Sequence, residues 1–414
     1  MKTLIKNVTV INPTETQTTD VLFDEKILSV GDYSADESEL KIIDGTNKIL
    51  IPALMDPHVH FRDPGFTYKE DFHTGTAAAA AGGVGTIFDM PNTNPPTFTR
   101  EKLAEKRAIA ESKALVNYGL YFGAGPDNLD EIRQAENVPG TKMYLNVTTG
   151  NLKMDDEEQW RKIFSLGKKI SLHAEGETFF RAVEIWRELG TPCELHLCHA
   201  SLASEIELIR QVKADPTVTN RISVEVCPHH LFMTGKERLK YGAFCCMKPP
   251  LAEQSDVDAL WVGVEDGTID CFATDHAPHT KEEKLESDID TNPIYGIPGV
   301  ETLFQLIFTE FVKRGWSLNK FVKMTSTNIV EVFNIADKKG NITKGYDADF
   351  VLIDAQWAGE IKADRFLSKC TWTPFENWKV NGKIEKTFIA GTEVFDGEKI
   401  TNDLFRGREI CFKK

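Results

Sequence analysis

The stretch Asp56-Pro57-His58-Val59-His60 lies where the pattern of the sequence changes. Residues 1–52 read as short strands separated by turns, whereas apolar strands alternate with amphipathic helices from there to about residue 340. Side chains two positions apart on a strand share a face, so His58 and His60 can point to the same side. Two such imidazoles can bind one divalent ion, or they can be structural histidines with hydrogen-bond partners.

The alternation after this stretch predicts a closed barrel. Repeated strand-then-helix units imply a parallel sheet, and this many units over ~250 residues or more indicate a (β/α)8 TIM barrel, an α/β fold. We expect the barrel to occupy residues 53–340. Its predicted helices include residues 100–115 and residues 201–213, the latter capped by Ser201. Predicted strands after the first cover residues 85–89, 117–122, 140–145, 170–173, 194–198, 222–226 and 271–274.

Both ends of the chain are rich in strands and turns. We expect residues 1–52 and 341–414 to pack together as a small β-sandwich domain beside the barrel. The charged segment Lys281–Asn292 reads as a mobile surface loop. Predicted strands in the two ends cover residues 3–11, 20–23, 26–30 and 40–43, then 349–353, 378–380 and 386–389.

Composition narrows the class of protein. The 414 residues carry a formal net charge of −15, which argues against a nucleic-acid partner. No apolar run reaches the length of about 18 residues that a membrane span needs, and the N-terminus lacks the apolar core of a signal peptide. The eight cysteines are scattered, as reduced thiols are. We therefore expect a cytoplasmic protein without a membrane partner.

Further polar residues fall at the ends of predicted strands. His173 and His199 end two of them, and Asp275 follows the last. The reactive groups of barrel enzymes lie at the C-terminal ends of the strands. Together with His58 and His60, these residues predict a metal site.

Lys142 lies inside an apolar predicted strand, facing inward if the register holds. Burial favours the neutral form of an amine. A neutral amine can capture carbon dioxide as a carbamate, an anionic group able to bridge two cations. The alternative is a lysine that extends from the strand end to solvent.

Four segments together resemble the amidohydrolase superfamily and, within it, the dihydroorotase family. The likeness extends over nearly the whole chain. Residues 142–146 and 225–232 look closest to the dihydroorotase domain of the animal multifunctional pyrimidine-synthesis protein. The segments that carry the resemblance are Asp56-Pro57-His58-Val59-His60-Phe61-Arg62-Asp63-Pro64-Gly65, Met90-Pro91-Asn92-Thr93-Asn94-Pro95-Pro96, Ala273-Thr274-Asp275-His276-Ala277-Pro278-His279-Thr280 and residues 345–354.

The resemblance implies a binuclear zinc site with a hydroxide between the metals. One Zn²⁺ would take His58, His60, Asp275 and a carboxylated Lys142 (N6-carboxylysine), and the other would take Lys142, His173 and His199. Asp275 would also serve as the general acid and base. A third zinc in this subgroup implies Cys198 and Glu225 as ligands, for which a buried thiol and a strand-end carboxylate are the alternative.

The resemblance also implies a substrate, the pair N-carbamoyl-L-aspartate and L-dihydroorotate of pyrimidine biosynthesis. Arg62, expected on the same strand face as His60, would grip its carboxylate, with Asn92 and His279 as further contacts. Lys248 falls where the animal domain has an arginine that contacts substrate. Thr148 lies in the expected active-site loop, where the animal domain has an aromatic residue nearby.

Rival functions share parts of this pattern. Dihydropyrimidinases, hydantoinases and allantoinases have the same metal site, but Arg62 with Asn92 favours an acidic ring. A non-catalytic scaffold should have lost metal ligands. The sequence leaves open whether the protein forms a homodimer. The other histidines are interpreted as structural or surface residues, namely His73, His196, His229, His230 and His276.

Overall fold

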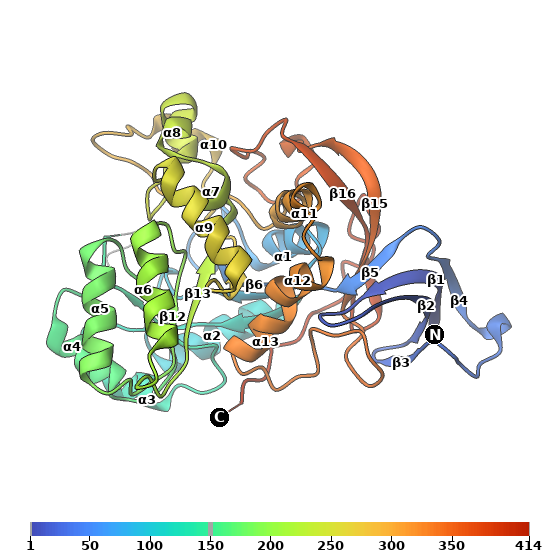
Figure 1. Ribbon diagram of the computed structural model, residues 1–414, viewed down its shortest axis with the longest axis horizontal. Coiled ribbons are helices and arrows are strands. Elements are labelled where there is room, and N and C mark those ends of the chain that lie inside the picture. Colours follow the sequence, from blue (N-terminus) through green and yellow to red (C-terminus); the bar gives the residue numbers. More distant parts are fainter. Residues whose placement is uncertain (1, 148–151, 414) are drawn as a thin grey trace.

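Apolar parallel strands form the barrel of this computed structural model, which describes residues 2–147 and 152–413 (Figure 1). Every residue of these strands is buried, as expected where helices cover one face and packed side chains fill the other. The strands are β6 (Leu54–Val59), β7 (Val84–Asp89), β8 (Asn117–Leu120), β9 (Phe122–Gly123), β10 (Thr141–Tyr144), β11 (Ile170–His173), β12 (Leu195–Leu197), β13 (Ile222–Val226) and β14 (Cys271–Phe272).

The strands pair in chain order. One sheet runs β6-β7-β8, and another runs from β9 through β14. A parallel bridge between Val59 and His276 joins the first strand to the segment after the last. There the His60 N–H donates to the carbonyl of His276 at 2.8 Å. The parallel order and this closing bridge agree with the predicted (β/α)8 barrel.

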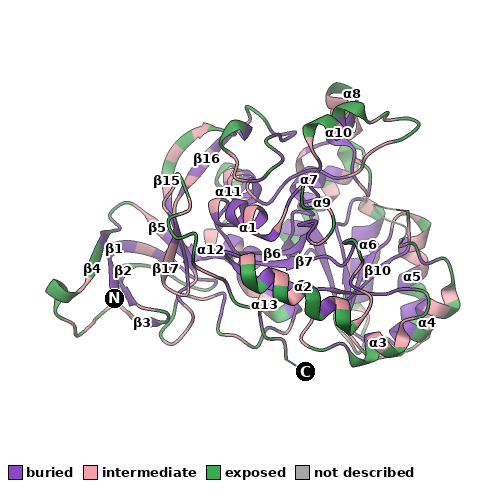
Figure 2. Cartoon of the chain, turned by 180° about the vertical axis from the view of Figure 1, so that it is seen from behind, coloured by how far each residue is buried: buried purple, intermediate pink, exposed green. Residues whose placement is uncertain are grey.

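Helices cover the outside of the barrel, and Figure 2 shows exposed residues on the outward faces of α3, α4 and α5. In α5 the buried side chains include Phe179, Ala182, Val183 and Trp186, a helical spacing that turns one face to the strands. No helix in the described part of the chain is both long and apolar enough to cross a bilayer. The helices are α1 (Phe72–Ala81), α2 (Arg100–Lys113), α3 (Leu129–Gln134), α4 (Glu157–Phe164), α5 (Glu177–Glu188), α6 (Ala203–Ala214), α7 (Pro228–Phe232), α8 (Gly235–Tyr241), α9 (Gln254–Asp266), α10 (Lys281–Glu286), α11 (Leu303–Arg314), α12 (Leu318–Val322) and α13 (Asn328–Val332).

Two local predictions differ from the structure. The segment predicted as a surface loop begins with helix α10, because Thr280 caps it and the buried Lys284 anchors it by donating to three carbonyl groups. Helix α6 begins after Leu202, so Ser201 is not its cap. Instead Glu205 accepts the N–H groups of Ser201 and Leu202 at 2.8 and 3.0 Å.

Glu205 makes the free energy of unfolding depend on pH. Burial raises the pKa of Glu205 to about 7, although the two N–H groups that it accepts oppose the shift. An unfolded glutamate has a pKa of about 4.3, so between about 4.3 and about 7 the folded chain holds a proton that the unfolded chain has lost. This contribution to the free energy of unfolding is full below that window and falls by about 1.4 kcal/mol per pH unit within it. Glu205→Gln should remove this component of the slope in urea unfolding at stepped pH; an unchanged slope would contradict the assignment.

The two ends of the chain meet in one sheet of order β17-β16-β15-β5-β1-β2-β3, with β4 paired to β1. Strand β5 runs antiparallel to β15, so Ile51 lies opposite Val351. The sheet's core includes Phe23, whose ring centroid lies 4.8 Å from that of Phe350. The expected boundaries at residues 52 and 340 stay predictions. The strands are β1 (Thr3–Ile11), β2 (Thr16–Phe23), β3 (Ile27–Val30), β4 (Lys41–Asp44), β5 (Ile49–Pro52), β15 (Phe350–Glu360), β16 (Lys379–Ile389) and β17 (Thr392–Phe395).

Candidate metal centre and active site

The histidines and the aspartate singled out in the sequence meet at the C-terminal end of the barrel. His58 lies on β6 and His60 just beyond it, while His173 is the last residue of β11. His199 and Asp275 follow β12 and β14 with positive φ angles of 38° and 48°. Such backbone is unfavourable for residues other than glycine, and it recurs at functional sites where the surrounding structure holds it.

Three side chains form a first group. The Asp275 Oδ1 atom lies 2.9 Å from the His60 Nε2 atom and 3.2 Å from the His58 Nε2 atom. The donor atoms of all three lie within 4.8 Å of one another. The fold thus brings His58 and His60, which belong to the first strand and its end, against Asp275, which follows the last strand.

His173 and His199 form a second group. The His173 Nδ1 and His199 Nε2 atoms are 2.8 Å apart. On its other side the His173 Nε2 atom lies 3.1 Å from the Glu175 carboxylate, which as an acceptor fixes the proton on Nε2 and leaves Nδ1 unprotonated, with its lone pair toward His199. The ring of His199 lies 5.3 Å from that of His58, so the two groups adjoin.

Lys142 lies between the groups. It is fully buried on β10, and its Nζ atom lies 2.9 Å from the Cys198 Sγ atom and 5.3 Å from the centroid of the Tyr144 ring. Burial and then the charge of Lys142 lower the pKa of His58 to about 4. Burial also lowers the pKa of His173, again with a contribution from Lys142. The Lys142 amine therefore contributes to a lower histidine pKa in both groups.

The charge states suit a cation. Burial and then the charge of His173 hold the pKa of His199 well below its ordinary value. Neutral imidazoles, the form that binds metals, therefore predominate near pH 7. Burial acts to raise the pKa of Asp275, but His58 and His60 hold it well below the usual range. The donor set is thus neutral nitrogen plus ionised carboxylate.

The Glu225 carboxylate orients the ring of His58. Its Oε1 atom lies 2.5 Å from the His58 Nδ1 atom and accepts the His199 N–H at 3.2 Å, while Oε2 lies 3.0 Å from the His196 Nε2 atom. An Nδ1–H donated to this carboxylate leaves the Nε2 lone pair of His58 free for the first group. The resemblance implied Glu225 only together with Cys198, whose Sγ atom does lie near Glu225 and His58.

A buried ion pair that sequence reasoning missed supports the site. The Lys106 Nζ atom lies 2.5 Å from the Asp89 Oδ2 atom and donates to the Met90 carbonyl at 2.6 Å. Asp89 also accepts the N–H of Phe61 at 2.7 Å. The pair thereby ties the segment after β6 to the segment after β7. The sequence did hold a signal for a buried lysine, since Lys106 falls three residues after Leu103 on the apolar face of α2.

Breaking this pair should destabilise the fold. Lys106→Met leaves the buried Asp89 carboxylate without its cation, with only the Phe61 N–H to offset its charge, which typically costs about 3–5 kcal/mol. Urea unfolding measures the loss, and Lys102→Met on the exposed side of α2 is the control, expected to stay within about 0.5 kcal/mol of the unmodified chain. Equal effects of the two substitutions would contradict a supporting role for the pair.

Arg62 reaches the site by a different route from the one expected. Strand β6 ends at Val59, and Arg62 has a φ of 63°, so it does not continue the strand face of His60. Its Nε atom donates to the Pro278 carbonyl at 3.2 Å, and a terminal nitrogen lies 3.3 Å from the His279 Nε2 atom. The left-handed turn still leaves the guanidinium beside the site.

A small hollow of about 20 Å³ opens beside the first group. Lys248 lines it, with its Nζ atom 3.4 Å from the Glu175 carboxylate and 5.2 Å from the centroid of the Tyr295 ring. Asn92 also lines it, and its Oδ1 atom lies 2.6 Å from the His60 Nδ1 atom. Thr148 lies outside the described residues. The lining residues are His60, Arg62, Asn92, Lys248, Asp275, Ala277, Tyr295 and Gly296.

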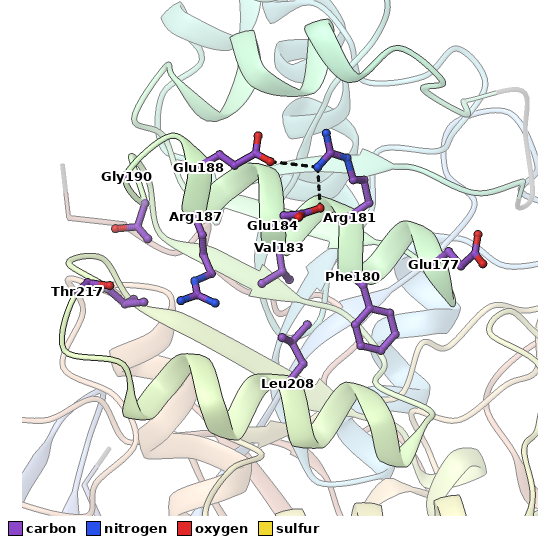
Figure 3. A pocket seen from close by; sticks show the side chains of 12 residues that line it. Glu177, Phe180, Arg181, Val183, Glu184, Arg187, Glu188, Gly190, Leu208 and Thr217 are labelled. Atoms are coloured by element: carbon purple, nitrogen blue, oxygen red, sulfur yellow. Dashed lines mark hydrogen bonds and ion pairs between the residues drawn. The ribbon is translucent and has the colours of Figure 1, made fainter.

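A much larger groove of about 930 Å³ lies elsewhere, between α5 and α6 (Figure 3). Several of its charged side chains pair with one another, as Arg181 contacts Glu184 at 2.6 Å and Glu188 at 3.1 Å. Among the described residues that line it there is neither a histidine nor a cysteine. The small hollow, not the large groove, therefore holds groups for metal and proton chemistry.

Comparisons with known proteins agree with this geometry. The model of the amidohydrolase family matches residues 49–394. A dihydroorotase of Methanosarcina mazei is 34% identical over 414 residues, covering 90% of each chain. A dihydroorotase of Enterococcus faecalis is 34% identical, covering 96% of this chain and all of its own. The multifunctional protein CAD of Squalus acanthias is 34% identical, with 91% of this chain and 16% of its own length covered.

Solved structures give the same fold. An L-hydantoinase from Arthrobacter aurescens has a TM-score of 0.90 at 26% identity, with 99% of each chain covered. A dihydropyrimidinase from Brevibacillus agri has a TM-score of 0.89 at 26% identity over all of each chain. The chain belongs to the amidohydrolase family, whose members are metal-dependent hydrolases. Within it, several relatives by sequence are dihydroorotases, which confirms the predicted cyclic amide hydrolase of dihydroorotase type.

Proposed function

We propose that this chain interconverts N-carbamoyl-L-aspartate and L-dihydroorotate at a binuclear zinc centre beneath the small hollow. The observation that carries the proposal is the meeting of His58, His60 and Asp275 beside the pair His173 and His199. A hollow shared by Arg62 and Asp275 places a carboxylate-binding group next to these donors.

The donors fit two zinc ions. His58, His60 and Asp275 would hold one ion, and His173 with His199 would hold the other. Lys142, carboxylated on its buried amine, would join them. A third ion at Cys198 and Glu225 would compete with the contacts that these residues make to Lys142 and His196. When bound, zinc supplies Lewis acidity that activates water and polarises an amide carbonyl.

Asp275 would move the proton. Its low pKa keeps the carboxylate ionised near neutral pH, and its Oδ1 atom lies at the hollow beside His60. In ring opening it takes the proton of the attacking water and delivers it to the departing ring nitrogen. In ring closure the same carboxylate takes the proton from the attacking nitrogen and delivers it to the departing carboxylate oxygen, which leaves as water.

The substrate carboxylate would bind at the cationic side of the hollow. Arg62 presents a planar fork that can bind a carboxylate through two parallel hydrogen bonds. The Pro278 carbonyl and His279 hold the guanidinium in place. Asn92 lines the same hollow, and Lys248 adds a second positive charge.

A substrate panel tests the proposal. With the zinc-loaded chain, we expect hydrolysis of L-dihydroorotate and cyclisation of N-carbamoyl-L-aspartate, with dihydrouracil, hydantoin and allantoin turned over poorly. The solved relatives named as hydantoinase and dihydropyrimidinase make these neutral rings the relevant alternatives. Hydrolysis of dihydrouracil with L-dihydroorotate left intact would overturn the assignment.

A further inference from the structure

A second cluster of metal-binding side chains lies next to the centre without sharing a residue with it. Cys227, His229 and His230 follow β13 and begin α7, and at most 2% of each residue is exposed. Their donor atoms lie within 4.8 Å of one another. The two imidazole rings are 4.3 Å apart in an edge-on arrangement.

Both histidines have a buried ring nitrogen without a partner among the described residues, Nε2 of His229 and Nδ1 of His230. The other nitrogen of His230 lies 3.0 Å from the Pro249 carbonyl. A carbonyl only accepts, so that nitrogen carries the proton and the Nδ1 atom keeps a free lone pair. This is the arrangement that prepares a histidine to bind a metal. Buried polar atoms left without any partner are rare in native proteins.

The charge state agrees with ligand binding. Burial and then the charge of His230 hold the pKa of His229 well below its ordinary value, and burial lowers the pKa of His230. Both rings are therefore neutral near pH 7, and neither is satisfied by a carboxylate. A purely structural role, as the sequence suggested, does not explain why two neutral rings converge on a thiol with nitrogens unpaired.

We propose that Cys227, His229 and His230 form a further site for a zinc-type transition-metal ion, separate from the catalytic centre. One thiolate with two imidazoles suits zinc, while the absence of carboxylates from this group disfavours magnesium and calcium. Three protein ligands leave a fourth position for water or an external ligand. Binding would deprotonate the thiol and release its proton, although burial raises the pKa of the free Cys227 well above its ordinary value.

The position of the site gives it a structural role. Strand β13 carries Glu225, which orients His58, and His230 contacts the carbonyl of Pro249. Pro249 directly follows Lys248, which lines the small hollow. A metal held here would fix the segment that presents Lys248 relative to the strand that presents Glu225.

Cobalt reconstitution of the full chain tests the site. Cys227→Ala should lose about one equivalent of bound Co²⁺ and the near-ultraviolet absorption of a thiolate-to-cobalt bond. Cys193→Ala, which removes a thiol equally buried at 1% exposure or less, is the matched control and should keep both. Equal cobalt content in the two variants would overturn the proposal.

Two more variants separate this site from its neighbours. Cys198→Ala removes the thiol beside Lys142. If Cys198→Ala lost the thiolate-to-cobalt absorption while Cys227→Ala kept it, the proposal would be overturned. His229→Gln keeps the thiol and tests the site should Cys227→Ala fail to fold. We expect His229→Gln to weaken cobalt binding by at least about tenfold, since losing even a hydrogen-bond partner of a metal ligand typically costs that much. Cobalt binding unchanged in His229→Gln would also overturn it.

Discussion

Asp275→Asn should lower kcat for L-dihydroorotate hydrolysis by about a thousandfold to ten-thousandfold, the upper range for losing a general acid or base. Asparagine keeps the shape of the side chain and one oxygen toward His60, but it cannot take up the proton of the attacking water. The substitution also removes a negative charge from the first group, so metal content is measured alongside the kinetics. We expect the remaining activity to lose its dependence on an ionised carboxylate in the pH profile.

Asp258→Asn on the exposed face of α9 is the matched control and should leave kcat unchanged, because its carboxylate only accepts from Gln254 there. A variant at Asp275 that keeps its full metal content and more than about a tenth of kcat would rule out the proton-transfer role. Lost metal with kcat restored by excess zinc would assign Asp275 to metal binding alone.

Lys142→Met should also abolish most activity, through the metals. Methionine fills a similar buried volume without the amine, so no carbamate can form between the two groups. Loss of a bridging anion removes several kcal/mol of charge stabilisation, which corresponds to about a thousandfold in kcat. Plasma emission measurements should show reduced zinc. Urea unfolding of the metal-free chains should show no loss of stability, because methionine fills the buried position without a polar group that needs a partner.

The dependence of activity on carbon dioxide tests whether Lys142 is carboxylated. Reconstitution of the metal-free chain in carbonate-free buffer should be slow and should accelerate when bicarbonate is added, whereas Lys142→Met should respond to neither. Lys153→Met, at an exposed position before α4, is the control. Full activity of the Lys142 variant without bicarbonate would show that the amine has no such role.

The barrel was predictable because its strands are buried on both faces and therefore read as apolar runs. Strands β11 and β13 have the predicted bounds, and His173 ends its strand as expected. The candidate site was predictable for the same reason, since groups at successive strand ends meet at one end of a barrel. Whether those residues bind metal in the proposed way stays a prediction.

What the sequence did not predict depends on contacts between distant segments. The pair of Lys106 and Asp89 has no local pattern beyond one charged residue on an apolar helix face. The turn that redirects Arg62 depends on a single positive φ angle, which leaves no periodic signal. Lys284 similarly looked like part of a charged loop, because the carbonyl groups that hold it come mostly from a segment about forty residues earlier.

The bridge between Val59 and His276 has a consequence for how the protein is made. His58 and His60 leave the ribosome before Asp275, which follows them by more than two hundred residues. The first group is therefore incomplete until Asp275 has been synthesised, and it forms only when the last barrel strand docks against the first. A nascent chain that ends before Asp275 can present up to four of the site histidines, yet it lacks the carboxylate that we propose carries the proton. If Asp275 has the proposed role, activity arises only in a chain whose barrel is already complete.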